Sequence, residues 1–175
     1  MNNKLNLGCG MKKIEGYLNC DISKEVEPDK LVDLENKLPF KDNSIRGVVG
    51  NHILEHITNF ILLMRELHRI CKGGAILKFK VPFYLSVGAF SDPTHVRFFT
   101  PFTFHDLVNK EFEHEFKLGD MFKINKVKIM YAFQNKKIVN FFINPIINLS
   151  HRCYCKFFAG IFPAAEIEFE LEVVK

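Results

Sequence analysis

The alternation of apolar and polar residues divides the first half of the chain into short strands and one helix. Apolar runs bounded by turn residues predict five strands, at Lys4 to Leu7, Gly16 to Asp21, Leu31 to Leu34, Arg46 to Gly50 and Ala75 to Val81. Between the last two, apolar side chains recur at spacings of three and four, as on one helix face: Ile61, Met64, Leu67 and Cys71. We expect Thr58 or Asn59 to cap this helix and Gly73-Gly74 to end it.

The second half of the chain predicts a loop, a helix, two further strands and a long apolar segment. The loop is expected over residues 83–100 and the helix near 102–113, with strands at Phe122 to Ala132 and Glu166 to Val174. This order favours an α/β fold with a doubly wound, Rossmann-like, mostly parallel sheet of about seven strands, the last of them antiparallel. Without a linker or repeat, residues 1–175 are expected to form one domain, with an apolar insert at about 134–163.

The connection between the first two strands is unusually short. Only eight residues, Gly8 to Glu15, separate them, which is less than a full crossover helix needs. The sequence therefore predicts reduced first crossover helices.

Charge and cysteine content narrow the partners and the compartment. The formal net charge is +4 and the basic residues are scattered, so nucleic acid is not expected as a partner. Because Met1 to Lys4 are polar, no secretory leader is expected, and the five cysteines are an odd number. We therefore expect reduced thiols and a cytoplasmic protein.

A glycine pair and a carboxylate follow the first two predicted strands. Gly8 and Gly10 bracket Cys9 at the end of the first strand, and Asp21 ends the second. Ligands bind outside the carboxyl ends of parallel strands, where glycine permits close approach and a carboxylate can accept bonds from ribose hydroxyls. The pair therefore suggests a nucleoside site, although a simple tight turn stays open. A dinucleotide fingerprint is disfavoured because Lys13 replaces its third glycine.

An ordered set of motifs carries a family resemblance. LNLGCG, GYLNCDI, LVDLENKLPFKDNSI, NHILEHI, ELHRICKGGAILKFKVP and DPTHVRFFT resemble the class I S-adenosylmethionine-dependent methyltransferases, most closely small methyltransferase-11-like members. The resemblance implies S-adenosylmethionine as the cofactor. By this resemblance Gly8, Cys9 and Gly10 line its methionine and ribose, and Asp21 holds the ribose. The remaining implied cofactor contacts are to the adenine, from Ile22, Asp33 and Leu34, and beside the sulfonium, from Asn51 and His52.

The segment 91–100 supplies candidate chemistry on the ligand side of the sheet. A hydroxyl acceptor must lose a proton, and an imidazole suits that role near neutral pH. We expect His95 to act as general base, Asp92 to orient its ring and Arg97 to anchor an anionic group of the substrate. His56 is expected at the cofactor mouth, facing the substrate. The alternative is a structural turn in which Asp92 pairs with Arg97 and His95 caps a helix.

No metal site is expected. His52 and His56 have H-x-x-x-H spacing, but Glu55 directly precedes the second histidine, so the H-E-x-x-H order is absent. Cys153 and Cys155 have no matching second pair of ligands and are interpreted as packing residues.

The apolar segment 136–163 has three open interpretations. It is interrupted by polar residues and proline before it reaches the length of a transmembrane helix. We favour a pocket wall that also packs on the sheet; the alternatives are peripheral membrane contact and a homodimer interface.

The expected activity is methyl transfer from S-adenosylmethionine to an oxygen or nitrogen nucleophile. The acceptor is expected to be a small metabolite or sugar that carries an anionic group for Arg97. The alternatives are a non-catalytic cofactor-binding module and a methyltransferase acting on RNA or protein. A nicotinamide-dependent oxidoreductase is disfavoured by the missing third glycine.

Overall fold

Seven strands form one mixed sheet in the computed structural model, which describes residues 3–108, 118–132 and 136–175. The strands are β1 (Lys4–Leu7), β2 (Leu18–Asp21), β3 (Lys30–Leu31), β4 (Ile45–Asn51), β5 (Cys71–Pro82), β6 (Phe122–Met130) and β7 (Glu166–Val173). Their order is β3-β2-β1-β4-β5-β7-β6. Strands β1 to β5 pair in parallel, whereas β7 is antiparallel to both β5 and β6. The predicted Rossmann-like sheet with an antiparallel last strand is confirmed.

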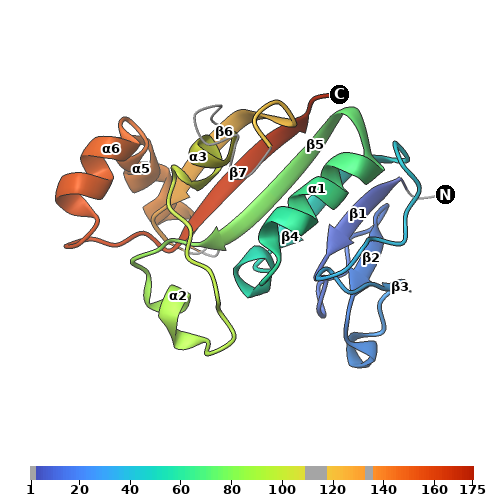
Figure 1. Cartoon of the computed structure of the whole chain (residues 1–175). Helices are drawn as coiled ribbons and strands as arrows, with labels where there is room; N and C mark the ends of the chain where they lie inside the picture. Colours follow the sequence, from blue (N-terminus) through green and yellow to red (C-terminus); the bar gives the residue numbers. More distant parts are fainter. Residues whose placement is uncertain (1–2, 109–117, 133–135) are drawn as a thin grey trace.

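The helices lie after β4 and in the second half of the chain. They are α1 (Phe60–Ile70), α2 (Val87–Ser91), α3 (Thr103–Val108), α5 (Lys137–Ile147) and α6 (His151–Cys153). Short helical segments occur at η1 (Lys24–Val26), η2 (Leu54–His56) and η4 (Tyr154–Phe158). Figure 1 shows α1 crossing one face of the sheet, while α2, α5 and α6 gather beyond the end at which β5 terminates.

Several predicted boundaries need correction. Helix α1 ends at Ile70, and β5 begins at once with Cys71, so Gly73-Gly74 lies within the strand rather than at the helix end. The third strand occupies Lys30–Leu31 instead of Leu31 to Leu34, and the predicted loop 83–100 contains α2. The helix predicted to reach residue 113 is described only to Val108, because residues 109–117 lie outside the described part of the chain.

Helix α1 forms where the apolar period predicts it, but its cap comes from another segment. Its buried apolar stripe is Phe60, Leu63, Met64, Leu67 and Ile70. The Asn59 side chain makes no capping bond. Instead the Glu35 carboxylate accepts from the backbone N–H groups of Thr58 (2.6 Å) and Asn59 (2.8 Å). A negative group at a helix N-terminus satisfies unpaired donors and complements the helix dipole.

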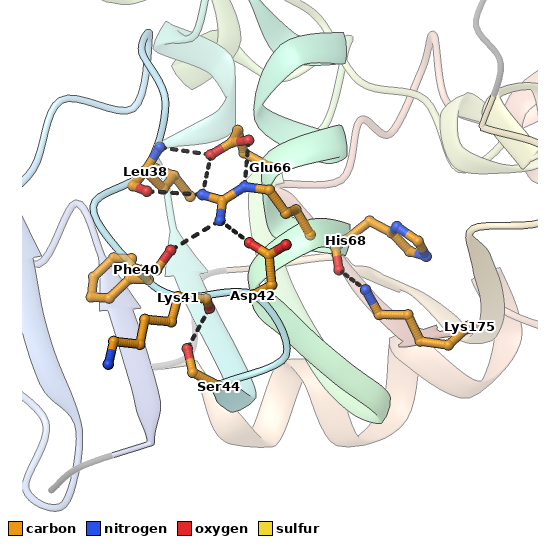
Figure 2. A network of polar contacts seen from close by, with 9 residues as sticks. Leu38, Phe40, Lys41, Asp42, Ser44, Glu66, His68 and Lys175 are labelled. Atoms are coloured by element: carbon orange, nitrogen blue, oxygen red, sulfur yellow. Dashed lines mark hydrogen bonds and ion pairs between the residues drawn. The ribbon is translucent and has the colours of Figure 1, made fainter.

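A polar network fastens the β3–β4 connection to α1 (Figure 2). Glu66, only 8% exposed, accepts from the Leu38 N–H and pairs with Arg69. The Arg69 guanidinium also donates to the carbonyls of Leu38 and Phe40 and to the Asp42 carboxylate. The pKa of Glu66 is lowered, chiefly by its bond with Arg69. The loop that precedes β4 is thereby fixed against the helix that follows it.

The face of the sheet opposite α1 carries charged pairs. Alternate residues of β5 and β7 point to this side, where Lys78 pairs with Glu170 (3.2 Å) and Lys80 with Glu168 (3.0 Å). The other alternating set, which includes Phe79 and Phe169, is buried with α1 and α3. Because β1 and β2 are joined by turns alone, this face lacks the helix that a full crossover would supply, as the eight-residue connection predicted.

Helix α5 packs through an amide stripe on the edge strand β6 and the residues that follow it. Asn140, Asn144 and Asn148 recur every four residues and bond to the backbone of residues 129–132. Edge strands present unpaired backbone groups, which these side chains satisfy. The apolar insert therefore seals the edge of the sheet with its polar side.

Candidate functional site

The two glycines after β1 form a tight turn against the end of β2. Gly8 has φ +59°, and a Cβ added there would lie 2.6 Å from the Ile53 side chain, so only glycine fits. The Gly10 N–H donates to Asp21 Oδ2 (2.9 Å), and the Ser23 N–H donates to Asp21 Oδ1 (3.0 Å). Each oxygen of Asp21 keeps a lone pair for a further donor.

Six of the predicted site residues line one pocket of about 180 Å³. It is lined by Gly8, Asp21, Ile22, Val32, Asp33, Leu34, Glu35, Ile53, His56 and Ile57. Pockets that bury whole drug-sized ligands measure about 300–1,000 Å³. The size, the apolar walls and the Asp21 carboxylate therefore fit the nucleoside part of a larger ligand.

The other predicted cofactor residues lie outside this pocket lining. Cys9 is 4% exposed, and burial raises the pKa of its thiol. Gly10 faces open space beside the turn. Asn51 lines a separate hollow of about 330 Å³ on the charged side of the sheet, with Val49 and Lys80.

His52 bridges two buried carboxylates. Its Nδ1 lies 3.2 Å from Glu55 Oε1 and its Nε2 lies 2.8 Å from Glu166 Oε1. The hydrogen bonds to Glu166 and Glu55 raise the pKa of His52 to about 9. The residue has φ +53°, a left-handed backbone conformation that is uncommon outside glycine. His52 is therefore held as an imidazolium at neutral pH.

The segment 91–100 folds back onto η2 and brings His95 to His56. The N–H groups of Val96 and Arg97 donate to the Glu55 carbonyl, at 2.9 and 3.2 Å. The rings of His56 and His95 meet edge to face, with centroids 4.7 Å apart. His95 Nδ1 lies 2.9 Å from the Ala89 carbonyl, which can only accept, so Nδ1 carries the proton and Nε2 a lone pair in the neutral ring.

Asp92 and Thr94 orient the second histidine. Thr94 Oγ1 lies 2.6 Å from Asp92 Oδ1 and 2.9 Å from His56 Nδ1. Because the hydroxyl donates to the carboxylate, it accepts from His56 Nδ1. Bonds from the Thr94 side chain and backbone lower the pKa of Asp92. Asp92 Oδ2 lies 4.0 Å from His95 Nε2, an ion-pair distance, while the Ala89 carbonyl orients the His95 ring.

Arg97 is placed on the loop that leads into α1. Its Nε and Nη2 donate to the carbonyls of Ile57 (3.3 Å) and Thr58 (2.8 Å), and the guanidinium lies over the Phe60 ring. The two hydrogen bonds are made by Nε and Nη2, and Nη1 takes part in neither of them.

Three residues of this region escaped the sequence reasoning, and a fourth, Glu55, was considered there only for its spacing from His52 and His56. Glu55 and Glu166 hold His52, Thr94 orients His56, and Glu35 lines the pocket while capping α1. A buried acid within the apolar run NHILEHI was a usable signal for Glu55. Glu166 gave none, because 114 residues separate it from His52.

The apolar insert forms a second pocket of about 510 Å³ that shares no lining residue with the first. Its walls are mostly aliphatic and aromatic: Tyr131, Ile143, Ile146, Ile147, Leu149, Ser150, Cys153, Tyr154, Phe158 and Phe162. The insert contacts the residues after β5 through the rings of Phe83 and Tyr154 (5.9 Å).

Comparison with known proteins shows which family and which solved structures this chain resembles. A family model described as a methyltransferase domain matches residues 5–79. A S-adenosylmethionine-dependent methyltransferase structure from Archaeoglobus fulgidus is 18% identical with a TM-score of 0.62, covering 97% of this chain and 85% of that one. One from Mesorhizobium loti is 12% identical with a TM-score of 0.60, covering 97% and 90%.

The fold is also shared with a protein of different described chemistry. The structure of the [4+2]-cyclase SpnF is 15% identical with a TM-score of 0.57, covering 98% of this chain and 75% of that chain. Among curated proteins, no sequence matches significantly. The matched segment contains the glycine turn, Asp21 and η2, and S-adenosylmethionine is the cofactor of the matched family. Residues 5–79 therefore match the methyltransferase-domain family, and the chain has the fold of S-adenosylmethionine-dependent methyltransferases.

Proposed function

We propose that the protein transfers a methyl group from S-adenosylmethionine to an oxygen or nitrogen nucleophile of a small acceptor. The observation that carries this proposal is the position of two histidines. His56 lines the pocket that fits a nucleoside, and the His95 ring contacts the His56 ring edge to face. The proposed proton acceptor, His95, therefore lies next to the proposed cofactor pocket. The proposed acceptor is a metabolite or sugar with an anionic group.

The proposed cofactor contacts follow the pocket lining. Asp21 accepts from the ribose hydroxyls, Ile22 and Leu34 pack on the adenine, and Asp33 faces its edge. Gly8, Cys9 and Gly10 present backbone to the methionine portion, which extends beyond the 180 Å³ pocket past the open side of Gly10. Asn51 and His52 stay proposed as neighbours of the sulfonium, since both close the end of β4.

The proposed chemistry uses His95 as general base. When bound, the cofactor supplies a methyl on a sulfonium, which is already a good leaving group. His95 Nε2 has the lone pair needed to accept the proton of the acceptor hydroxyl or amine as the new bond to the methyl forms. The Asp92 carboxylate, 4.0 Å from Nε2, then stabilises the imidazolium. His56 and the remaining Nη1 of Arg97 are proposed to hold the acceptor and its anionic group.

The first test is calorimetric titration with S-adenosylhomocysteine. Wild-type protein should bind saturably, and Asp21→Ala should weaken binding at least about tenfold, or about 1.4 kcal/mol. Glu25→Ala removes an exposed carboxylate of η1 with the same change in net charge and should leave binding unchanged. Equal affinity for wild type and Asp21→Ala would refute the ribose assignment.

A non-catalytic cofactor-binding module is the alternative to methyl transfer. The cyclase described above shows that this fold serves chemistry other than methyl transfer. His95→Gln distinguishes the two: an enzyme should lose release of S-adenosylhomocysteine from an acceptor panel while keeping its affinity. A methyltransferase acting on RNA or protein stays a further alternative, which salt-dependent binding to RNA would favour.

The proposed organisation is a single domain. The sheet combines strands from both ends of the described chain, since β7 pairs with β5. Among the described residues, no helix has the length and hydrophobicity needed to cross a bilayer.

A further inference from the structure

Glu55, His56 and His95 form a cluster of metal-ligating groups beside the nucleoside pocket. One ligand atom from each residue lies within 4.8 Å of the other two. Glu55 and His56 are adjacent in η2, and His95 arrives from the loop after α2, docked by the N–H groups of residues 96 and 97 on the Glu55 carbonyl. The backbone positions of Glu55, His56 and His95 are therefore fixed by η2 and by these backbone hydrogen bonds.

Both histidines are oriented to offer the same nitrogen. Each carries its proton on Nδ1, donated to Thr94 Oγ1 in one case and to the Ala89 carbonyl in the other. Nε2 of each neutral ring therefore keeps its lone pair. Metal-binding histidines characteristically donate their second ring N–H to an oxygen in this way, which fixes the ring and raises its basicity.

Glu55 supplies an independent observation. The residue is 1% exposed and its Oε1 contacts His52. Its Oε2 is the sole buried side-chain nitrogen or oxygen among the described residues that lacks a hydrogen-bond partner. Buried carboxylate oxygens without a donor are rare because desolvation disfavours them. Glu55 with this unpartnered oxygen thus belongs to the group in which one ligand atom of each residue lies within 4.8 Å of the others, and Asp92 Oδ2 lies 4.0 Å from His95 Nε2.

We propose that Glu55, His56 and His95 bind a divalent transition-metal ion, with Zn²⁺ as the best match. Two imidazoles and one carboxylate form a recognised catalytic zinc set that leaves a coordination position for water or substrate. This inference rests on the proposed function and deepens it. An acceptor hydroxyl bound to the ion would lose its proton to solvent at lower pH, and its oxygen would then attack the methyl. In the metal-bound protein His95 Nε2 would be a ligand and not the general base, so this inference keeps the proposed methyl transfer and changes the role assigned to His95.

The test is direct measurement of Zn²⁺ binding to the full chain after chelator treatment. Calorimetry and metal analysis of dialysed protein should give one ion per chain. Glu55→Gln and His95→Gln should each lower affinity at least about tenfold, in line with loss of a ligand. His105→Gln, a histidine of α3 outside the cluster, is the matched control. His95→Gln lies on a loop, so the test does not depend on the buried Glu55 variant folding.

The cysteines need their own control. Cys153 is exposed and could hold Zn²⁺ with Cys155. Co²⁺ absorption separates the two cases, since thiolate ligation produces intense near-ultraviolet bands and nitrogen–oxygen ligation does not. Absence of stoichiometric binding, or binding that persists in His95→Gln but disappears in Cys153→Ser, would overturn the proposal. S-adenosylhomocysteine affinity is read separately, so failure of the metal site and failure of the cofactor assignment are distinguishable.

Helix α5 buries polar side chains against the sheet and exposes apolar side chains, the opposite of the usual amphipathic arrangement. Its buried positions include Asn140 and Asn144, which bond to β6 and the residues after it. Its outward face carries Ile138, Phe141, Phe142 and Ile146, which are 65–78% exposed. The exposed apolar surface continues through Leu149, Phe157, Phe158, Ile161 and Phe162. Contiguous apolar surface of this kind marks an interaction site.

The charge of the same segment selects the partner. Residues 121–165, which include β6 as well as this segment, contain no Asp or Glu but seven cations: Lys123, Lys126 and Lys128 on β6, and Lys136, Lys137, Arg152 and Lys156 in the insert. A second copy of the chain would oppose like charges across this face. A bilayer with anionic headgroups complements both the cations and the exposed aromatic residues. We propose that α5 to η4 dock on an anionic lipid surface.

Vesicle sedimentation tests this second proposal. Wild-type protein should sediment with phosphatidylglycerol-containing vesicles, and the pair Phe141→Ser, Phe142→Ser should reduce the bound fraction about tenfold. Met11→Ser, which removes an exposed apolar residue of the β1–β2 turn, is the control. Neutral vesicles should bind less than anionic ones. Equal sedimentation of the double variant, or a wild-type dimer in solution that this variant dissociates, would overturn the proposal.

Discussion

His52 should make the protein lose stability as pH rises from about 6 to 9. Its pKa is about 9 in the folded protein because of the bonds to Glu166 and Glu55, against 6.5 as the ordinary value. A folded pKa above the unfolded one gives stability that is complete below pH 6.5 and is lost as pH rises through about 9. In the unfolded chain the imidazole releases its proton first, so folding then requires proton uptake.

The size of the effect follows from the pKa difference and the exposure of the ring. One pKa unit corresponds to about 1.4 kcal/mol, so the full difference would give about 3 kcal/mol. The side chain is 40% exposed, and solvent screening reduces this to about 1.5–2 kcal/mol. Burial raises the pKa of Cys20 and Cys71 to about 12 from an ordinary 9.0, so their destabilising effect begins near pH 9; wild type and a His52 variant share it, and it cancels in the comparison.

Urea unfolding at intervals between pH 6 and 9 measures the effect. The reference is His52→Asn, because asparagine tolerates a positive φ and keeps an amide donor without titrating. The difference in unfolding free energy between wild type and variant should shrink by about 1.5–2 kcal/mol across the window. Parallel pH profiles for the two proteins would refute the assignment of a bridging imidazolium.

Three further substitutions test the site and its supports. Gly8→Ala should abolish S-adenosylhomocysteine binding in calorimetry, since its Cβ would lie 2.6 Å from Ile53; binding within about threefold of wild type would contradict this. Arg69→Met should cost about 2–3 kcal/mol in urea unfolding, because Glu66 keeps only the Leu38 donor, and adding Glu66→Gln should recover part of the loss. Asn144→Leu should cost about 1–3 kcal/mol by leaving the Tyr131 N–H unpaired; an unchanged midpoint would show that the amide stripe contributes nothing.

The local pattern of the sequence determined the strands, the position of α1 and the glycine turn. Strand and helix periods are read from neighbouring residues, so β1, β4, β7 and α1 lie close to their predicted places. Asp21 could be anticipated for the same reason, since the ends of adjacent parallel strands meet at one edge. The boundaries failed where pairing decided them: β5 starts four residues early because Cys71 pairs with Ile45.

Only the tertiary structure decided which polar groups meet. Glu166 reaches His52 across 114 residues, and Glu35 caps a helix that begins more than twenty residues later. From the sequence we expected Asp92 to orient the His95 ring. In the folded protein the Ala89 carbonyl orients this ring, and Glu55 lies in the same cluster. Such contacts depend on chain paths that no local period encodes.

The apolar insert shows most clearly the difference between what the sequence pattern determines and what the tertiary structure decides. Its composition revealed that it is too interrupted to span a membrane, but not which side of α5 faces solvent. By pattern alone the asparagines at every fourth position belong outside. In the folded protein they face inward, because the unpaired backbone of the β6 edge needs hydrogen bonds that only polar side chains supply, and the apolar residues are left exposed.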